Sequence, residues 1–368
     1  MTAPALLRPL LALLFALPAL AAAAPPPAQD PVAENMLLLQ TASGGWPKHW
    51  RGRAVDYGRV FDDTERQALR APDRPDDATL DNKATTREIA HLAQAWERTG
   101  NPAYLNAARR GVEWLLRAQY PNGGWPQYYP DRAFYRHQIT FNDDAMVRAL
   151  HLLQDIAEAR GALAALTPEF GVRARQALER GIACILATQV RIDGRPTIWA
   201  AQYDEVTLQP AKARAYELPS LAVAESVGVV RLLMRQPAPD AGIVAAVESA
   251  AAWLEAHRLP DLALRQVDAP HEETGRDVLV VAQPGASLWA RFYDLERQQP
   301  LFVNREGERV ADFRRMPNER RVGYAWYGTW PEKLLAVELP RWRQAHAAAV
   351  AAYRRATDAS DPSQVEDR

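Results

Sequence analysis

Cysteine is almost missing from this chain of 368 residues: Cys184 is the only one, which excludes an internal disulfide and a disulfide-stapled scaffold. An excess of one charge is missing too, because 44 Lys and Arg face 45 Asp and Glu, for a formal net charge of −1. This balance excludes the broad positive field of a nucleic-acid-binding protein. The seven histidines are scattered and form no zinc-binding motif. A charged ligand must therefore be held by a local site.

Long apolar runs are also scarce. One follows Arg8, PLLALLFALPALAAAA at 9–24, and it ends in small side chains, so we interpret residues 1–24 as a secretory signal peptide. The run is short for a bilayer span, so we expect no membrane anchor in the mature form and an exported, periplasmic or extracellular protein. Residues 25–31 are interpreted as a Pro-rich tether, 32–357 as one folded domain and 358–368 as a polar tail.

Helical periodicity dominates what is present. Apolar residues at i, i+3, i+4 and i+7 predict a helix over 85–98, and Asn101-Pro102 is typical of the cap and first residue of a second helix. Asn142 is expected to begin a third helix that stops at Gly161. Further helices are expected to begin at Thr167-Pro168, Leu218-Pro219, Asp240 and Trp330-Pro331. Strand signals are limited to 278–282 and 301–310, which we expect to pair as a small hairpin with Glu306-Gly307 near its turn.

A short motif recurs after predicted helices. It reads QTASGGWPK at 40–48, QYPNGGWPQ at 119–127 and QVRIDGRPTIW from Gln189 onward. A helix ending in Gln, followed by a glycine turn and a tryptophan, is typical of stacked helical hairpins. We therefore predict an all-α fold, a toroid of helical hairpins resembling an α/α barrel, with a few short β pieces. Such folds bind ligands where loops between helices meet at one end.

Two acidic segments, DNKATT at 81–86 and NDD at 142–144, directly precede predicted helices. Capping explains much of this pattern, because Asp and Asn are preferred N-caps and carboxylates gain from the helix dipole. Asp81, Asp143 and Asp144 are also the hard oxygen donors that calcium prefers. The chain has no D-x-D-x-D-G loop, so a calcium site would be open, assembled from distant segments and completed by substrate.

Three further segments carry candidate side chains. The long polar loop 202–219 holds Lys212 and Arg214, and loops of this length are uncommon unless they serve a site. Arg291 lies among aromatic residues in WARFYD at 289–294, on an expected helix, where it is either a snorkelling arginine or a functional one. The aromatic cluster at 324–331 forms either core or a wall on which sugars stack.

Seven segments together resemble the family 10 polysaccharide lyases, the pectate lyases with a helical toroid. They are GGWPK at 44–48, DNKATTREI at 81–89, AQYPNGGWPQYYP at 118–130, ITFNDDAMVRAL at 139–150, AQYDEVTLQPAKARAYELPSL at 201–221, WARFYDLE at 289–296 and GYAWYGTWP at 323–331. The resemblance implies that residues 32–357 form a monomeric catalytic domain. It further implies calcium-dependent cleavage of polygalacturonate by β-elimination.

The resemblance also implies roles for individual residues. Arg291 corresponds to the base that takes the C5 proton, and Asp81 and Asp143, with Asp144 beside it, correspond to the calcium site. Arg214 corresponds to a clamp for the substrate carboxylate, and the further expected substrate contacts are Lys212, Arg276 and Lys83. The sequence departs from the family pattern at Lys83, where glycine is usual, and at Leu218-Pro219, where two prolines are usual. If residue 83 has a positive φ, lysine there is strained by roughly 1 kcal/mol.

The chemistry of C5 deprotonation agrees with these roles. The C5 proton lies beside a carboxylate, so a cation and arginine donors on that carboxylate would stabilise the developing charge. Arginine acts as a base only when neutral, and we expect calcium, Arg214 and other cations around Arg291 to favour that form and to give an alkaline optimum. The alternatives are a non-catalytic polyuronate-binding protein, an inverting glycoside hydrolase with carboxylates ~6.5–9.5 Å apart, and a cyclase of the kind that repeats Gln and Trp after helices, which the charged loops fit poorly.

Overall fold

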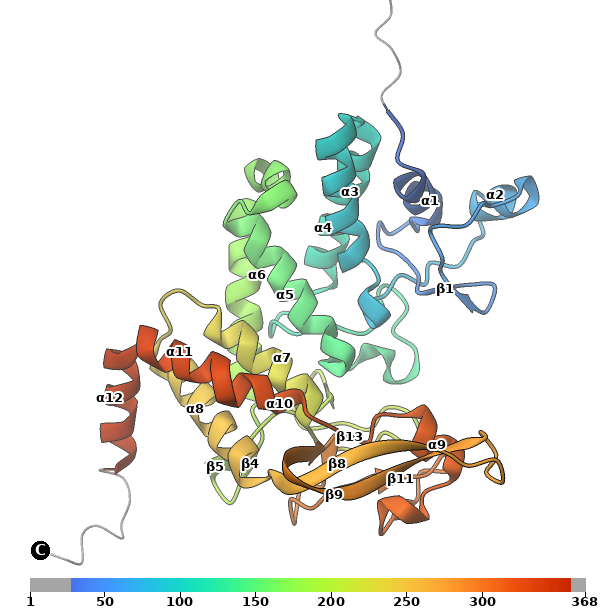
Figure 1. Cartoon of the computed structure of the whole chain (residues 1–368). Helices are drawn as coiled ribbons and strands as arrows, with labels where there is room; N and C mark the ends of the chain where they lie inside the picture. Colours follow the sequence, from blue (N-terminus) through green and yellow to red (C-terminus); the bar gives the residue numbers. More distant parts are fainter. Residues whose placement is uncertain (1–27, 359–368) are drawn as a thin grey trace, which may run out of the picture.

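The computed structural model describes residues 28–358, so the predicted signal peptide and the predicted tail beyond Asp358 lie outside the described residues. Helices are the main regular structure of this part of the chain (Figure 1). The body consists of α1 (Pro31–Leu39), α3 (Thr86–Thr99), α4 (Pro102–Ala118), α5 (Ala145–Ala157), α6 (Thr167–Thr188), α7 (Val223–Met234) and α8 (Ala241–Ala256). Shorter helices are α2 (Asp63–Leu69), α9 (Asn318–Gly323), α10 (Trp330–Lys333), α11 (Leu339–Ala345) and α12 (Ala347–Asp358). None of the described helices is both long enough and apolar enough to cross a bilayer.

The long helices pack in two adjacent rows. Consecutive helices form the hairpins α3–α4, α5–α6 and α7–α8, which step from upper right to lower left in Figure 1. One row contains α3, α5, α7 and α10, each in contact with the next, and the other contains α1, α4, α6 and α8. One continuous apolar core lies between the rows and includes Leu92, Leu115 and Leu153. The predicted all-α fold of helical hairpins is therefore confirmed.

Most predicted helix starts are confirmed at the residue expected. The side chain of Asn101 accepts from the backbone N–H of Ala103 at 3.0 Å and caps α4, and Asp240 caps α8 in the same way. Three boundaries were wrong. Helix α5 begins at Ala145, after the 3₁₀ turn Asn142–Asp144, and it ends at Ala157, before Gly161. Helix α7 begins at Val223 rather than at Leu218-Pro219, because the two residues before it pair as a short strand, β7 (Leu221–Ala222).

The recurring Gln and Trp residues tie these rows together. Gln40, Gln119 and Gln189 each follow a helix, and each donates its side-chain amide to a carbonyl of the next helix in the row α1, α4, α6, α8. The buried indoles of Trp46, Trp125, Trp199 and Trp289 each donate to a carbonyl near the end of the preceding helix of that row, at 2.7–2.8 Å. The last tryptophan shows that the motif occurs a fourth time.

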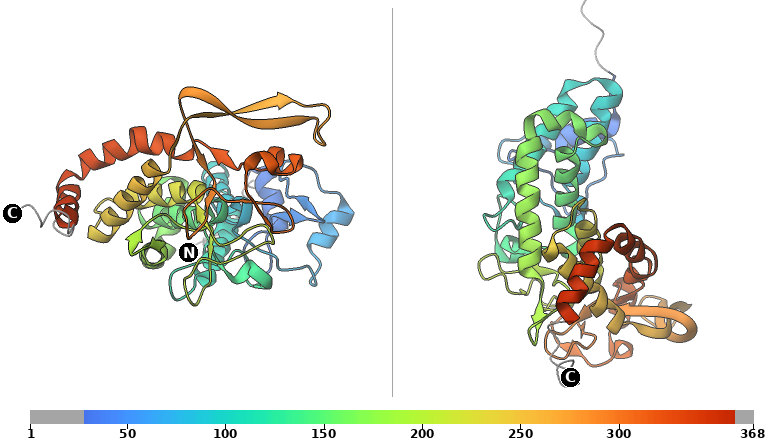
Figure 2. Two further views of the ribbon diagram at one scale, coloured as in Figure 1. Left: turned by 90° about the horizontal axis from the view of Figure 1, so that it is seen from below. Right: turned by 90° about the vertical axis from the view of Figure 1, so that its left-hand side faces the viewer.

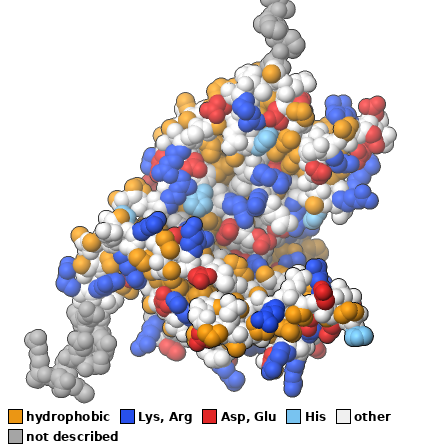
Figure 3. All heavy atoms as spheres, viewed as in Figure 1, with side chains coloured by type: hydrophobic (Ala, Val, Ile, Leu, Met, Phe, Trp, Pro, Cys, Tyr) orange, Lys and Arg blue, Asp and Glu red, His pale blue; other side chains and the backbone are white. Residues whose placement is uncertain are grey.

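The strands are short except for one hairpin, in which β8 (Leu259–Asp268) pairs with β9 (Arg276–Ala290). This hairpin projects from the helical body (Figure 2). The short strands are β1 (His49–Trp50), β2 (Arg53–Ala54), β3 (Ile139–Thr140), β4 (Arg191–Ile192), β5 (Arg195–Pro196), β6 (Gln202–Tyr203), β10 (Phe292–Tyr293), β11 (Phe302–Val303), β12 (Arg309–Val310) and β13 (Tyr327–Gly328). The face seen in Figure 3 is hollowed between the helical body and the β8–β9 hairpin, with charged side chains along the rim.

Two local predictions for this region were wrong. Residues 278–282 do not pair with 301–310: β9 pairs with β8, and β11 pairs with β12 around the Glu306-Gly307 turn. WARFYD is not helical, because it ends β9 and forms β10, which pairs with β7. The burial of Trp289, Ala290 and Tyr293 on both sides of Arg291 explains this, since the strand fixes these side chains in the core.

Candidate active site

The candidate residues lie at the N-terminal ends of one row of helices. A single 3₁₀ turn, Asp81–Lys83, leads into α3, and the equivalent turn Asn142–Asp144 leads into α5. The two turns have the same bend, because Asn82 and Asp143 both have a φ of 51°. Backbone N–H groups and the positive ends of the helix dipoles therefore face this region, which favours an anionic ligand.

Capping does not explain the acidic residues of these turns. No side chain accepts a capping hydrogen bond at the start of α3 or of α5. Residues Asn82, Lys83, Asp143 and Asp144 all have positive φ, which costs energy in residues other than glycine. Strain of this kind is typical of functional sites. The capping interpretation is therefore wrong for Asp81, Asp143 and Asp144.

A polar cavity of about 140 Å³ brings the two turns together, and we call it the central cavity. It is lined by Asp81 and Asn82 from one turn, Asn142 and Asp143 from the other, and Lys48, Gln127, Tyr135, Gln202, Arg214 and Glu217 from loops. Asp81 is buried and its carboxylate pairs with the ammonium group of Lys48. The side-chain oxygen of Gln127 is buried and accepts no hydrogen bond. The cavity thus gathers oxygen donors around an ion pair.

Arg214 lies in this cavity but is held by a neighbour. Its Nε donates to Glu217 at 2.9 Å, and its Nη2 pairs with the other oxygen of the same carboxylate. This double contact raises the pKa of Arg214 above its ordinary value despite partial burial. Arg214 can therefore bind a substrate carboxylate only by exchanging or sharing Glu217.

A second cavity, of about 290 Å³, adjoins the first through Asp143, which lines both. Arg291 lines this second cavity, and only 13% of its side chain is exposed. Its Nη2 lies 2.5 Å from Glu225 Oε1 and 3.4 Å from Asp143 Oδ1. Glu225 is in the first turn of α7, and its second oxygen, Oε2, is buried without a hydrogen-bond partner. Arg291 is thus fixed between a buried carboxylate and the residue shared by the two cavities.

Among the described protein groups, the charged neighbours of Arg291 differ from those expected. Burial opposes the charged guanidinium, but Glu225, together with Tyr324 and Asp143, outweighs burial and raises the pKa of Arg291. Arg214 does not contribute the expected repulsion, because it is paired with Glu217 in the central cavity. In this structure Arg291 is accordingly a strongly held cation.

Asp144 points away from Asp81. It lines the second cavity, where its carboxylate lies 3.7 Å from Arg148 Nη2. Burial raises the pKa of Asp144, Arg148 lowers it, and Glu225 and Asp143 raise it further, so the pKa is raised overall. The adjacent helix α7 leaves room for it at Gly228, where an added Cβ would lie 2.3 Å from Asp144 Oδ1. Asp81 and Asp143 therefore share a cavity, whereas Asp81 and Asp144 do not.

The other predicted contacts are outside both cavities. Lys83 and Lys212 are exposed, and neither is among the residues that line the central or the second cavity. Arg276 is exposed at the start of β9, where its carbonyl accepts from Thr274 and Asn318. In residues 28–358, no group of three or more His, Cys, Asp or Glu side chains is arranged to hold a metal ion.

Lys48 and Glu225 are residues that the sequence analysis did not select. Lys48 is one of only four lysines, and it stands in the recurring GGWPK motif, so its rarity was an available signal. The fold makes its position clearer: the residues two places after the four buried tryptophans are Lys48, Gln127, Ala201 and Arg291. Lys48 and Arg291 therefore occupy equivalent positions, and each is paired with a carboxylate at the start of a helix in the same row. Glu225 had no sequence signal beyond its place in a helix.

Comparisons with known proteins place the chain in a family. A family model described as pectic acid lyase matches residues 40–335. A solved family 10 polysaccharide lyase from Cellvibrio cellulosa is 33% identical, with a TM-score of 0.72 over 83% of this chain and 89% of that one. A mutant of a family 10 polysaccharide lyase from the same organism, in complex with trigalacturonic acid, is also 33% identical, with a TM-score of 0.72 over 83% and 90%. No curated protein matches the chain.

Proposed function

The chain belongs to the pectic acid lyase family and is a polysaccharide lyase, and on this premise we propose that it cleaves α-1,4-linked polygalacturonate by β-elimination with the help of calcium. One observation carries the proposal: Asp81 and Asp143, from turns far apart in the sequence, line one cavity, and Asp143 also contacts Arg291. The solved relative bound to trigalacturonic acid supports a galacturonate oligomer as the ligand.

The residues of the central cavity fit a calcium ion. Asp81, Asn82 and Asp143 offer hard oxygen donors, and the buried side-chain oxygen of Gln127 has no other partner. These donors do not enclose a cation by themselves, which suits a site that a substrate carboxylate completes. We propose that Asp81 and Asp143 hold the ion, which would supply positive charge next to the uronate carboxylate. Asp144 is not proposed as a ligand of the same ion, because it lies in the second cavity.

Arg291 is the proposed base. It would accept the C5 proton at a guanidine nitrogen while the C5–H electron pair forms the C4–C5 double bond. The C4–O4 electron pair would leave with O4, which would take a proton from water. This step needs the neutral side chain, and Glu225 and Asp143 favour the charged one. The neutral fraction grows with pH, so the proposal predicts an activity that rises through the alkaline range.

The remaining cationic groups are proposed to hold the substrate. Lys48 and Arg214 both line the central cavity, and each is paired with a carboxylate that a uronate group resembles. The forked guanidinium of Arg214 and the ammonium group of Lys48 both favour binding of an anionic polymer. Lys212, Arg276 and Lys83 are exposed and would touch only parts of a polymer that extend beyond the cavity.

The deciding experiment is the release of unsaturated products, measured by ultraviolet absorbance, from polygalacturonate with added calcium. We expect product with calcium, loss of the signal with a chelator, and recovery when calcium is restored. Saturated products would instead indicate a glycoside hydrolase, and polymer binding without any product would indicate a binding protein.

The proposed base is tested by Arg291→Ala. This variant should lose most of kcat while polymer affinity changes little, since the base acts in the transition state. Ala103→Leu, an exposed change in the first turn of α4, serves as the matched control. Normal turnover by Arg291→Ala would show that another group takes the proton.

A further inference from the structure

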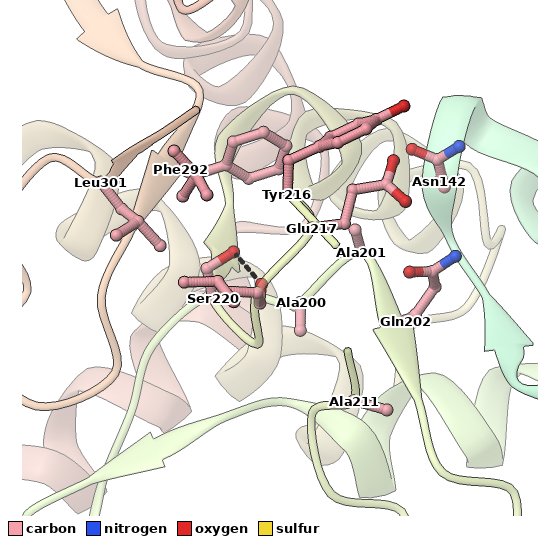
Figure 4. A pocket seen from close by; sticks show the side chains of 12 residues that line it. Asn142, Ala200, Ala201, Gln202, Ala211, Tyr216, Glu217, Ser220, Phe292 and Leu301 are labelled. Carbon is pink, nitrogen blue, oxygen red and sulfur yellow. Dashed lines mark hydrogen bonds between the residues drawn. The ribbon is translucent and has the colours of Figure 1, made fainter. Parts of the chain in front are cut away.

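A narrow apolar pocket opens beside the central cavity, and no step proposed above uses it. This side pocket has a volume of about 20 Å³, enough for one group the size of a water molecule or a methyl group. Its apolar walls are formed by Ala201, Ala211, Leu218, Phe292, Leu301 and Val303. In Figure 4, Ala201 and Ala211 lie on one chain segment, and Phe292 and Leu301 lie on the segment after β9.

The side pocket shares its mouth with the central cavity. Asn142, Gln202 and Glu217 line both spaces, and in Figure 4 they lie on the side opposite Phe292 and Leu301. A sugar residue held in the central cavity is therefore adjacent to this pocket. A substituent on that residue or on its neighbour can enter it directly.

The charges of the pocket favour an uncharged substituent. Its lining contains no lysine or arginine, and Glu217 contributes a carboxylate at the mouth. Arg214, the closest cation in the loop, is already occupied by Glu217 through both of its oxygens. A uronate carboxylate entering here would meet an acidic group and no cation among the lining residues, and it would lose its hydration.

The inner wall offers few polar groups for a bound water. The hydroxyl of Ser220 donates to the carbonyl of Leu218, a hydrogen bond drawn in Figure 4, so this donor is already satisfied. The other inner side chains are aliphatic or aromatic. A water molecule there would lack the partners that it needs, whereas a methyl group would replace it favourably.

Resting on the proposed function, we propose that the side pocket receives the methyl group of a methyl-esterified galacturonate residue next to the residue being cleaved. The amides of Asn142 and Gln202 at the mouth provide donors for the ester carbonyl. The enzyme would then accept polymers that carry some methyl esters, while the cleaved residue itself keeps its free carboxylate for the cationic groups of the central cavity.

The test compares kcat/KM on polygalacturonate with kcat/KM on a partly methyl-esterified preparation of the same polymer. The variant Ala211→Leu fills the pocket and should lower the ratio of ester to acid activity about tenfold or more, the usual effect of one methyl group in an apolar pocket. Ala103→Leu, an exposed change of the same size on α4, should leave the ratio unchanged. Activity on the unesterified polymer reports whether each variant is folded.

A second variant enlarges the pocket. Leu218→Ala should retain activity on the methyl ester and raise the relative activity on the ethyl ester of the same polymer. An unchanged ratio in both variants overturns the proposal. An effect of Ala211→Leu that is confined to an O-acetylated polymer also overturns it. A wild-type enzyme that does not cleave next to any esterified residue overturns it as well. Absence of unsaturated product from every polymer would instead overturn the proposed function.

Discussion

Acid should destabilise the protein through His151, a residue of α5 that faces the end of α7. Its Nδ1 lies 2.8 Å from Nη1 of Arg235, which also pairs with Asp155. Burial, and then the positive charge of Arg235, lower the pKa of His151 from 6.5 to about 4. Nδ1 therefore accepts from the arginine, and the folded protein keeps the ring neutral under mildly acidic conditions.

The sign of the effect follows from proton binding. Below a pH of 6.5 the unfolded chain binds a proton at this histidine, and the folded protein binds it only near pH 4. The contribution of neutral His151 to stability is thus complete above pH 6.5 and is lost as the pH falls through this window. The whole difference amounts to about 3 kcal/mol of unfolding free energy, and most of it is lost by about pH 4.5.

Urea unfolding followed by tryptophan fluorescence measures this loss. Wild-type protein and His151→Gln, whose amide oxygen can accept from Arg235 without titrating, are compared at about pH 7 and about pH 4.5. Carboxylates elsewhere titrate in both proteins, so only the difference between the two falls in stability reports His151. We expect wild type to lose about 2 kcal/mol more than the variant over this interval. Equal losses would refute the reasoning.

Three other perturbations test the site and its scaffold. Lys83 has a φ of 69°, so Lys83→Gly should raise the unfolding free energy by up to about 1 kcal/mol in urea unfolding. Gly123→Ala should lower the unfolding free energy by about 2–4 kcal/mol, because the new Cβ at a φ of +91° would lie 2.0 Å from the carbonyl oxygen of Arg180. Gly194→Ala is the control: its φ is +76° and the space around it is open, so it should lower the unfolding free energy by only about 1 kcal/mol. Glu225→Gln removes the main partner that raises the pKa of Arg291, so the alkaline rise of kcat should shift to lower pH, and an identical pH profile would contradict this account.

Local patterns in the sequence were sufficient to predict several of the long helices. The stripe containing Ile89 and Leu92, and the Asn101-Pro102 start, depend on residues a few positions apart, and the structure confirms both. Pairing across long distances was not predictable in the same way. The predicted strand at 278–282 was assigned the wrong partner, because its true partner, β8, alternates weakly and has six of its ten residues exposed.

In the candidate site, too, the residues in local motifs were predicted and their long-range partners were not. Asp81, Asp143 and Arg291 stand in distinctive motifs, and the fold brings them to adjoining cavities. The carboxylate partners of the arginines come from other segments. Glu225, which pairs with Arg291, belongs to α7. Glu217 pairs with Arg214, the arginine that was expected to act on Arg291. Ion pairing depends on side-chain geometry that no short motif encodes, which is why the pairs Arg291–Glu225 and Arg214–Glu217 were not predicted.

The fourth copy of the tryptophan motif lies much farther along the chain from its preceding helix than the first two copies do. In the first two copies the indole reaches a carbonyl 10 residues earlier, but Trp289 reaches one 35 residues earlier, because the β8–β9 hairpin is inserted between them. Closing such an insertion costs little entropy when the hairpin pairs with itself, so the end of the motif keeps its place. The repeat thereby sets a cation two residues after the tryptophan in the first and fourth copies, Lys48 and Arg291. Each is aimed at the N-terminal ends of the same row of helices, so an anionic polymer lying across these ends would meet a cation from both copies.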